Sequence, residues 1–341
     1  MKFLSFGAGA IGTYIGGSLA LCGHEVVFLE RVVVVDELRQ KGLTLRLPDG
    51  EHHLSGPKLA ASLKEALEQG PYDAALFALK SFDTQAALEE MRLYASHLPP
   101  VVCLQNGVEN EAMIAAALGE AKVVPAIVTS AIGRRAAGSI ALERLRGVGL
   151  AAGHALAPQL HAAFEEAGLQ PRLYANARAM KWSKLLTNLL ANASSAILDM
   201  TPGEIFAHPG LFRLEMAQLR EALAVMQSQQ IPVVNLPGTP ARLLVLGVSL
   251  PSAIARPLMR RALSSGRGGK MPSFHIDLHS GRSQSEVEYL NGAVARFGRK
   301  LGIPTPVNDY LTRTLLALTR GDLPFNAYSR KPEKLLEEAG R

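Results

Sequence analysis

A glycine-rich loop near the start of the chain constrains its fold more than any other feature. An apolar segment, residues 2–6, leads directly into Gly7-Ala8-Gly9-Ala10-Ile11-Gly12, followed by an apolar helical pattern ending at Gly23 and a second apolar segment, 25–30. Strand, G-x-G-x-x-G, helix and strand in this order form the context that the dinucleotide-binding fingerprint requires. Gly7 permits the tight turn, Gly9 lets the backbone approach a pyrophosphate, and Gly12 allows close helix–strand packing. The sequence therefore predicts a dinucleotide site on residues 7–12.

The charges directly after the second strand distinguish between the two nicotinamide cofactors. An acidic side chain there favours the ribose 2′-hydroxyl of NAD, whereas an arginine accommodates the 2′-phosphate of NADP. Both occur here, as Glu30 and Arg31. If Glu30 is the last strand residue and points away, Arg31 opens the loop that faces the ribose. We therefore favour NADP (NADPH), with an Arg31 that merely solvates a loop as the alternative.

Strands and helices keep alternating through the first half of the chain. Apolar segments predict strands at 44–47, 73–81 and 101–107, with helices around 62–70 and 83–95. Such alternation is typical of a parallel sheet that binds ligands at the carboxyl ends of its strands. Lys80 and Asn106 stand at two of these ends, where a lysine suits a phosphate or ribose and an asparagine suits nicotinamide or substrate. We predict both as ligand contacts, although ordinary loop residues remain the alternative.

The alternation ends near residue 176. A further strand reaches Ala131, residues 138–151 have the pattern of antiparallel strands, and a helix near 158–167 precedes a strand at 171–175. Helical patterns dominate the rest of the chain. We therefore predict a doubly wound α/β Rossmann-like domain over residues 1–175 and an all-α domain over 176–341, where substrate binding and catalysis are expected.

Residues 176–197 are predicted to form one helix at the start of the second domain. Asn176 is a suitable N-cap, apolar residues recur at helical spacing, and no proline or glycine interrupts them. Lys184, Asn188 and Asn192 follow at four-residue intervals and form a polar stripe. A cation and two amides could protonate and hold an oxygen-rich substrate, while a solvated helix face is the alternative.

The remaining patterns complete the helical domain. Residues 199–210 have the composition of a Pro/Gly-rich turn, and helices are expected over 211–230, 283–302 and 306–321. Ser283 and Glu286 fit a capping box, so Glu286 has a purely structural interpretation. No metal site is predicted, because His52 and His53 form a lone adjacent pair and the other histidines are scattered.

The net charge of +6 comes from one segment. Residues 222–276 contain no Asp or Glu, but carry Arg242, Arg256, Arg260, Arg261, Arg267 and Lys270. No aromatic residues are interleaved with these cations, which argues against nucleic-acid binding. The segment is expected either to attract an anionic substrate or to cover a helix or subunit surface.

Two further observations concern the cellular compartment. No apolar run reaches the roughly 18 residues that a membrane helix needs, and no signal-peptide pattern is found at the N-terminus. Cys22 and Cys103 lie in apolar segments and suit buried thiols in a reducing environment. We therefore expect a cytoplasmic protein without a membrane partner.

Taken together, the motifs resemble the ketopantoate reductase family (2-dehydropantoate 2-reductases) over nearly the whole chain. The resemblance rests on GAGAIG at 7–12, Arg31 after GHEVVFLE, Lys80 in ALKS, QNG at 105–107, KWSKLLTN at 181–188 and SEVEYLNG at 285–292. It implies an NADP-dependent oxidoreductase that reduces a 2-keto acid with NADPH. The expected reaction converts 2-dehydropantoate (ketopantoate) to pantoate in pantothenate and coenzyme A biosynthesis.

The resemblance also implies roles for individual residues. Lys184, and not its neighbour Lys181, matches the catalytic lysine that acts as general acid, and Glu286 matches a carboxylate that contacts the ligands. Asn188, Asn192 and Ser273 match substrate contacts, and Asn106 lies at both the nicotinamide and the substrate. Lys80 and Ala131 match cofactor contacts, in addition to residues 7–12 and Arg31.

Two departures from the family pattern leave alternatives open. Pro202 replaces an asparagine that the well-known reductase carries, and the segment between residues 231 and 273 is longer than usual. The alternatives are another NAD(P)-dependent hydroxyacid or opine-type dehydrogenase on the same fold, and a non-catalytic NADP-binding protein. The exact keto acid and the oligomeric state are left open by the sequence, with a homodimer as the assembly considered.

Overall fold

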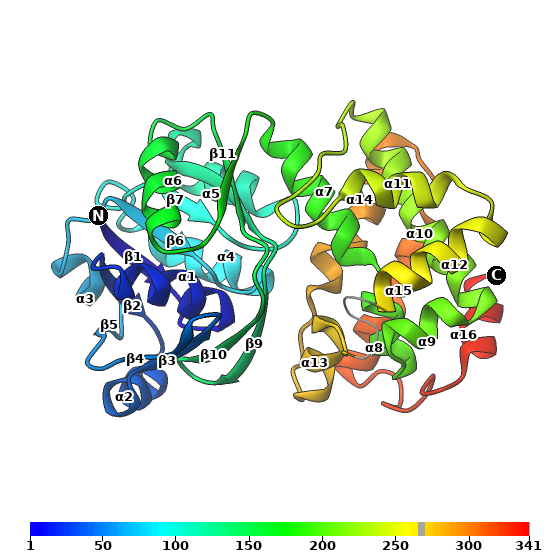
Figure 1. The fold of residues 1–341 in the computed structure, drawn as a ribbon, viewed down its shortest axis with the longest axis horizontal. Helices are drawn as coiled ribbons and strands as arrows, with labels where there is room; N and C mark the ends of the chain where they lie inside the picture. Colours follow the sequence, from blue (N-terminus) through cyan, green and yellow to red (C-terminus); the bar gives the residue numbers. More distant parts are fainter. Residues whose placement is uncertain (265–269, 341) are drawn as a thin grey trace. The chain divides into compact units, whose positions relative to one another are not determined.

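A mostly parallel eight-stranded sheet forms the centre of the first of two structural units (Figure 1). The computed structural model describes residues 1–264 and 270–340. The first unit comprises residues 1–181 and 236–239, and its sheet has the order β12-β11-β8-β7-β6-β1-β2-β5. The strands are β1 Lys2–Phe6, β2 Glu25–Leu29, β5 Lys58–Ala60, β6 Ala74–Phe77, β7 Val101–Cys103, β8 Val123–Val128, β11 Val148–Ala151 and β12 Pro171–Tyr174. All neighbours pair in parallel except β8 and β11.

Helices cover both faces of this sheet, as strands buried on two sides require. They are α1 Ala10–Leu21, α2 Val32–Lys41, α3 Leu63–Glu68, α4 Thr84–Arg92, α5 Asn110–Leu118 and α6 Ala157–Glu166, with short 3₁₀ turns η1 Ser81–Asp83 and η2 Glu120–Lys122. Alternate residues of β1 enter different cores: Phe3 packs with Ile15 of α1, whereas Leu4 packs with Ile114 of α5. The predicted α/β Rossmann-like fold of the first domain is confirmed.

A second sheet of four strands, in the order β4-β3-β10-β9, packs on the α1 side. Its strands are β3 Leu43–Leu47, β4 Gly50–Leu54, β9 Ala131–Ala136 and β10 Ser139–Arg144. The prediction that residues 44–47 join the parallel sheet is therefore wrong. Residues 138–151 were predicted to form antiparallel strands, and both of their strands do pair in this way. β10 pairs with β9 in the four-stranded sheet, whereas β11 pairs with β8 in the eight-stranded sheet.

Ala131 opens β9 and does not end the preceding strand, which corrects the prediction of one strand reaching it. The chain leaves β8 after Val128, and two residues then bond to the segment before β11. Thr129 donates its amide to the Gly147 carbonyl at 3.0 Å, and the Ser130 hydroxyl accepts from the Arg146 and Gly147 amides, each at 3.0 Å. These side-chain and main-chain bonds redirect the chain into the second sheet.

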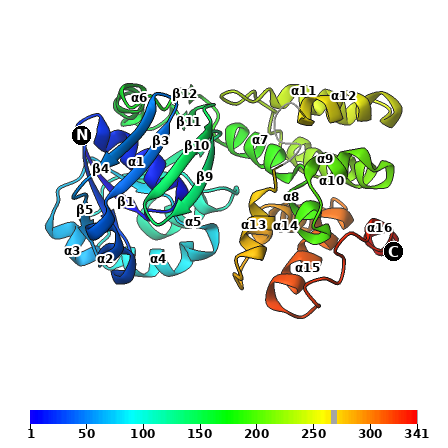
Figure 2. The ribbon, with the colours of Figure 1, turned by 60° about the horizontal axis from the view of Figure 1, so that its bottom comes forward.

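The described residues of the second unit, 182–235, 240–264 and 270–340, form helices and turns (Figures 1 and 2). After α7 Ala177–Leu189, which carries the division between the units, the helices are α8 Asn192–Leu198, α9 Pro202–Ala207, α10 Pro209–Ser228, α11 Ala241–Ser249, α12 Ser252–Ser264, α13 Ser273–His279, η3 Glu286–Tyr289, α14 Asn291–Leu301, α15 Pro306–Arg320 and α16 Pro332–Ala339. The predicted helical second domain is confirmed.

The single helix predicted over 176–197 is two helices. Asn176 does cap α7, because its Oδ1 accepts the amide of Ala179 at 2.8 Å. The helix then breaks at Ala191, whose φ of 49° lies in the left-handed region, and α8 starts at Asn192. Asn192 therefore does not continue the polar stripe of Lys184 and Asn188 on one helix.

Two other local predictions are corrected. Residues 199–210 contain α9, which begins with a capping box: Thr201 Oγ1 accepts the Glu204 amide, and Glu204 Oε2 accepts the Thr201 amide. Pro202 is its first residue, where a missing amide hydrogen costs nothing.

The capping box expected at Ser283 is wrong as well. Ser285 caps η3 by accepting the Val287 amide at 3.3 Å, and α14 begins only at Asn291.

Within the described part of the acid-free segment, three helices lie where the sequence analysis predicted none: α11, α12 and the first turn of α13. Arg260 and Arg261 are exposed and Arg256 is half-buried, while Arg267 lies outside the described residues. Four large apolar side chains of α11 and α12 are also more than half exposed: Leu243, Leu246, Ile254 and Leu258.

Cys103 is buried as expected, whereas Cys22 is exposed at the end of α1, so the prediction of two buried thiols is half wrong. Within residues 1–264 and 270–340, no helix combines the length and the apolar character needed to cross a membrane.

Candidate active site

The glycine-rich loop has the geometry that its sequence predicts. Gly7 adopts a φ of +93°, and its amide bonds to the Leu29 carbonyl at 3.0 Å. A Cβ on Gly12 would come within 1.9 Å of the Gly7 carbonyl oxygen, so only glycine permits this packing. A Cβ on Gly9 would meet nothing within 4 Å, which leaves the backbone at the start of α1 open to a ligand. No side chain caps this helix N-terminus.

Glu30 does not point away from the loop, which corrects the basis of the cofactor argument. Its Oε1 accepts the Ala8 amide at 2.8 Å, and its Oε2 accepts the Arg31 amide at 3.2 Å. Strand β2 ends one residue earlier, at Leu29. The Arg31 side chain is exposed, at the N-cap of α2. Glu30 thus braces the loop, and Arg31 extends into solvent.

The loops that carry Lys80 and Asn106 are tied together, since they follow the adjacent parallel strands β6 and β7. Gln105 Nε2 donates to the carbonyls of Leu79, at 3.0 Å, and of Lys80, at 3.3 Å. The Asn106 carbonyl accepts from Ser81 Oγ at 3.0 Å. The predicted placement of both residues at one edge of the sheet is therefore found.

Lys181 has a structural position that the sequence analysis did not foresee. Its side chain is 5% exposed, pairs with Glu111 of α5 at 2.6 Å and donates to the Gln105 carbonyl at 2.7 Å. Burial alone would lower the pKa of Lys181, but the Glu111 carboxylate raises it above its usual range, so the ammonium stays charged. Lys181 thereby fixes the residue next to Asn106.

Lys184 and Asn188 lie one turn apart on α7, both half-buried within the second unit. Their spacing places the ammonium and the amide on one face of the helix. The neighbouring Ser183 is fully buried and accepts the Val234 amide at 2.9 Å, which anchors another face of the helix.

The break at Ala191 brings Asn192 to α13. Asn192 Oδ1 accepts the Phe274 amide at 3.1 Å, and its Nδ2 donates to Ser273 Oγ at 3.4 Å. Asn192 is 6% exposed and Ser273 is exposed. The structure thus joins two predicted substrate contacts that are 81 residues apart in sequence. Glu286, 3% exposed in η3, belongs to the same unit, and its role beside Lys184 stays a prediction.

Two groups around these residues were missed by the sequence analysis. Glu215 of α10 accepts the Ala191 amide at 2.7 Å, and burial raises the pKa of this carboxyl to about 7. Asp199 lies beside His275 and His279 of α13, which corrects the interpretation of the histidines as scattered. The H-x-x-x-H spacing was a usable signal for the second group. Glu215 left no comparable signal in the sequence.

Comparisons with known proteins identify the family to which the chain belongs. The family described as ketopantoate reductase PanE/ApbA matches residues 3–152, and its C-terminal family matches residues 176–319. Among curated relatives, the 2-dehydropantoate 2-reductase of Halobacterium salinarum is 26% identical, with 94% of this chain and 98% of the relative covered. That of Mesorhizobium japonicum is 28% identical, covering 94% and 97%.

Solved structures give the same result. The PanE/ApbA family ketopantoate reductase from Ralstonia eutropha has a TM-score of 0.79 at 27% identity, over 94% of this chain and 99% of that one. The ternary structure of D-mandelate dehydrogenase with NADH and anilino(oxo)acetate has a TM-score of 0.77 at 21% identity over the same shares, a likeness of fold. The predicted family and enzyme class are thus confirmed: this oxidoreductase belongs to the ketopantoate reductase PanE/ApbA family.

Proposed function

We propose that the chain reduces a 2-keto acid with NADPH, and that 2-dehydropantoate (ketopantoate) is the substrate. The observation that carries this proposal is the match of the two family regions to both halves of the chain. Curated relatives of nearly equal length, named 2-dehydropantoate 2-reductase, support the same reaction. The product would be pantoate, which enters pantothenate and coenzyme A biosynthesis in organisms with that pathway.

The residues present fit a nicotinamide dinucleotide. The turn at Gly7 and the open backbone at Gly9 suit a pyrophosphate, which the uncapped N-terminus of α1 would attract. The exposed guanidinium of Arg31 suits a 2′-phosphate, because arginine binds phosphate through two parallel hydrogen bonds. Lys80, Asn106 and Ala131 are proposed as further cofactor contacts.

The proposed chemistry assigns proton transfer to Lys184. NADPH, when bound, supplies a hydride to the keto carbon. The carbonyl oxygen then gains negative charge, and Lys184 donates the proton that converts it to a hydroxyl. Asn188, Asn192 and Ser273 orient the substrate, and Asn106 is proposed as a further substrate contact. Glu286 holds a substrate hydroxyl or steers the lysine.

A second candidate is another hydroxyacid or opine-type dehydrogenase, and one observation favours it. Pro202, in place of an asparagine of the well-known reductase, is a buried residue at the start of α9 and offers no side-chain hydrogen bond. A substrate smaller or less polar than ketopantoate would not need that contact.

Steady-state assays separate these candidates. NADPH oxidation is measured with ketopantoate, pyruvate, 2-ketoisovalerate and oxaloacetate. We expect the highest kcat/KM with ketopantoate. A higher value with another acid would support the second candidate, and binding of NADPH without turnover of any acid would indicate a non-catalytic NADP-binding protein.

Three features of the whole protein complete the proposal. We place the domain boundary between residues 175 and 176, which the start of the C-terminal family match at residue 176 supports. The two compact units divide slightly later, after Lys181.

We also propose a cytoplasmic location, which the two free cysteines support. We further propose a homodimer, for which the exposed apolar side chains of α11 and α12 offer a surface.

A further inference from the structure

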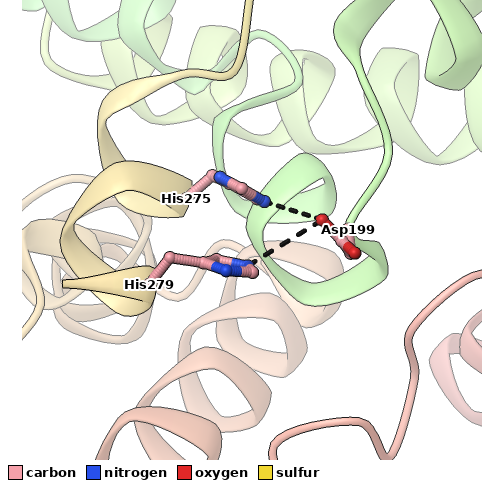
Figure 3. A group of neighbouring side chains, drawn as sticks. All are labelled: Asp199, His275 and His279. Carbon is pink, nitrogen blue, oxygen red and sulfur yellow. Dashed lines mark hydrogen bonds and ion pairs between the residues drawn. The ribbon is translucent and has the colours of Figure 1, made fainter. Parts of the chain in front are cut away.

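Three side chains from two neighbouring helices of the second unit converge in one group (Figure 3). Asp199 is the C-cap of α8, and His275 and His279 lie four residues apart on α13, so both rings leave the helix on one face. Figure 3 shows the two imidazole rings side by side, with the Asp199 carboxylate opposite their edges. Among the described residues, this is the one group of three such side chains placed to share an ion.

The distances between the donor atoms suit a small cation. Asp199 Oδ1 lies 2.8 Å from His275 Nε2 and 3.8 Å from His279 Nε2, and all three donor atoms fall within 4.8 Å of one another. Zinc binds imidazole nitrogen and carboxylate oxygen at about 2.0–2.2 Å, so two ligands of one tetrahedral ion lie roughly 3.4 Å apart. The observed separations bracket that value, and small side-chain rotations would equalise them.

A hydrogen-bonded cluster without a metal explains only part of this arrangement. The distance of 2.8 Å between His275 Nε2 and Asp199 Oδ1 is that of a hydrogen bond. The distance of 3.8 Å between His279 Nε2 and the same oxygen is too long for one. His279 is nevertheless held in place, because its ring stacks on His275 with centroids 3.8 Å apart and meets the edge of Phe325 at 4.9 Å. One cation would engage all three donors.

The group is open to solvent, and a nearby cationic side chain has its charge paired with another carboxylate. The side chains of Asp199 and His279 are 44% and 36% exposed, whereas His275 is 12% exposed. The nearby cation Arg330 pairs with Glu204 at 2.7 Å and reaches only the main-chain oxygen of Asp199, at 3.5 Å. Its charge is therefore largely compensated.

We propose that Asp199, His275 and His279 bind one divalent transition-metal ion, with Zn²⁺ as the best match to two imidazoles and one carboxylate. Solvent water completes the coordination. The ion joins α8 to α13, the two helices whose first residues, Asn192 and Ser273, are hydrogen-bonded to each other. It acts as a brace for these helices and takes no part in the proposed reaction.

Isothermal titration calorimetry with ZnCl₂ tests this site in the tag-free, chelator-treated full chain. We expect one Zn²⁺ per chain, with the affinity lowered at least tenfold in Asp199→Asn and in His279→Gln, since even outer-shell changes at metal sites cost about 10- to 100-fold. The matched control is His52→Gln, which removes another histidine paired with an aspartate, Asp49 at 3.0 Å, but without a third ligand.

The outcomes are distinct. Saturable binding that is weakened by Asp199→Asn and His279→Gln but not by His52→Gln supports the site. Absence of stoichiometric binding in the unmodified chain, or equal losses in all three variants, overturns it. Far-UV circular dichroism and NADPH binding show whether each variant is folded. Asp199→Asn keeps the side-chain volume and one acceptor oxygen, so it should fold even if His279→Gln does not.

Discussion

The carboxylate of Glu215 accepts the main-chain amide of Ala191 at 2.7 Å, at the point where α7 gives way to α8. Ser194 Oγ and Gln218 Nε2 donate to the same carboxyl group at 2.5 and 2.6 Å. Glu215 therefore replaces the hydrogen bond that a continuous helix would make at Ala191. This one buried side chain sets the direction of α8 and with it the position of Asn192.

The first prediction concerns the pH dependence of stability through Glu215. Burial raises its pKa from 4.5 to about 7, so the folded protein holds a proton that the unfolded chain releases between these values. The free energy of unfolding should therefore fall as pH rises from about 4.5 to 7, by about 3 kcal/mol at 1.36 kcal/mol per unit. Glu215→Gln should remove this contribution and be the more stable variant at pH 8.

Urea unfolding at pH 5 and pH 8 measures this difference. The Gln amide oxygen can accept from Ala191 and Gln218, and its nitrogen can donate to Ser194, so the break between the helices should persist. Glu165→Gln, at a carboxylate that is 72% exposed, is the control. If Glu215→Gln and the unmodified protein lost stability in parallel between the two pH values, the proposed protonation would be wrong.

Local patterns predicted most elements of both domains, because apolar periodicity and glycine turns act within a few residues. They did not predict the break at Ala191, since its cause is a carboxylate 24 residues away in sequence. The structural role of Lys181 could not be predicted for the same reason, because its partner Glu111 lies 70 residues earlier on another helix. The four-strand sheet was missed because β4, with the sequence GEHHL, lacks an apolar pattern.

The second prediction separates the two lysines of α7. Lys184→Ala should lower kcat by roughly a hundredfold or more, the usual scale for a general acid, while NADPH binding and thermal stability persist. Lys181→Met should have the opposite profile. It leaves the Glu111 charge buried, which should cost about 3–5 kcal/mol of stability, with a smaller loss of kcat in the molecules that remain folded.

Steady-state kinetics and thermal unfolding of both variants provide the measurements. The double variant Lys181→Met with Glu111→Leu serves as a control, since removing both charges should restore part of the stability lost in Lys181→Met. A large loss of kcat in Lys181→Met together with an unaffected Lys184→Ala would mean that the catalytic lysine has been assigned to the wrong position.

The third prediction concerns cofactor choice at Arg31. NADPH should bind at least about tenfold more tightly than NADH, which corresponds to the 1.4 kcal/mol expected of one charge-assisted contact. Arg31→Ala should remove most of this preference without changing NADH affinity. Glu30→Ala should weaken both cofactors, because it removes the oxygen that accepts the Ala8 amide and braces the loop. Fluorescence titration measures the affinities, and equal binding of NADPH and NADH by the unmodified protein would refute the assignment.

The last prediction concerns Ser273, whose exposed hydroxyl lies 3.4 Å from Asn192 Nδ2. If Ser273 binds the substrate carboxylate, Ser273→Ala should raise KM for the keto acid about tenfold or more, since a hydrogen bond to a charged group contributes about 1.5–3 kcal/mol. The NADPH dissociation constant and the unfolding temperature should stay unchanged, because the Asn192 bond to the Phe274 amide remains. Ser280→Ala is the matched control at the other end of α13, where the hydroxyl bonds to the Asp277 carbonyl. Equal KM values for the two variants would assign the Ser273 hydroxyl a structural role beside Asn192.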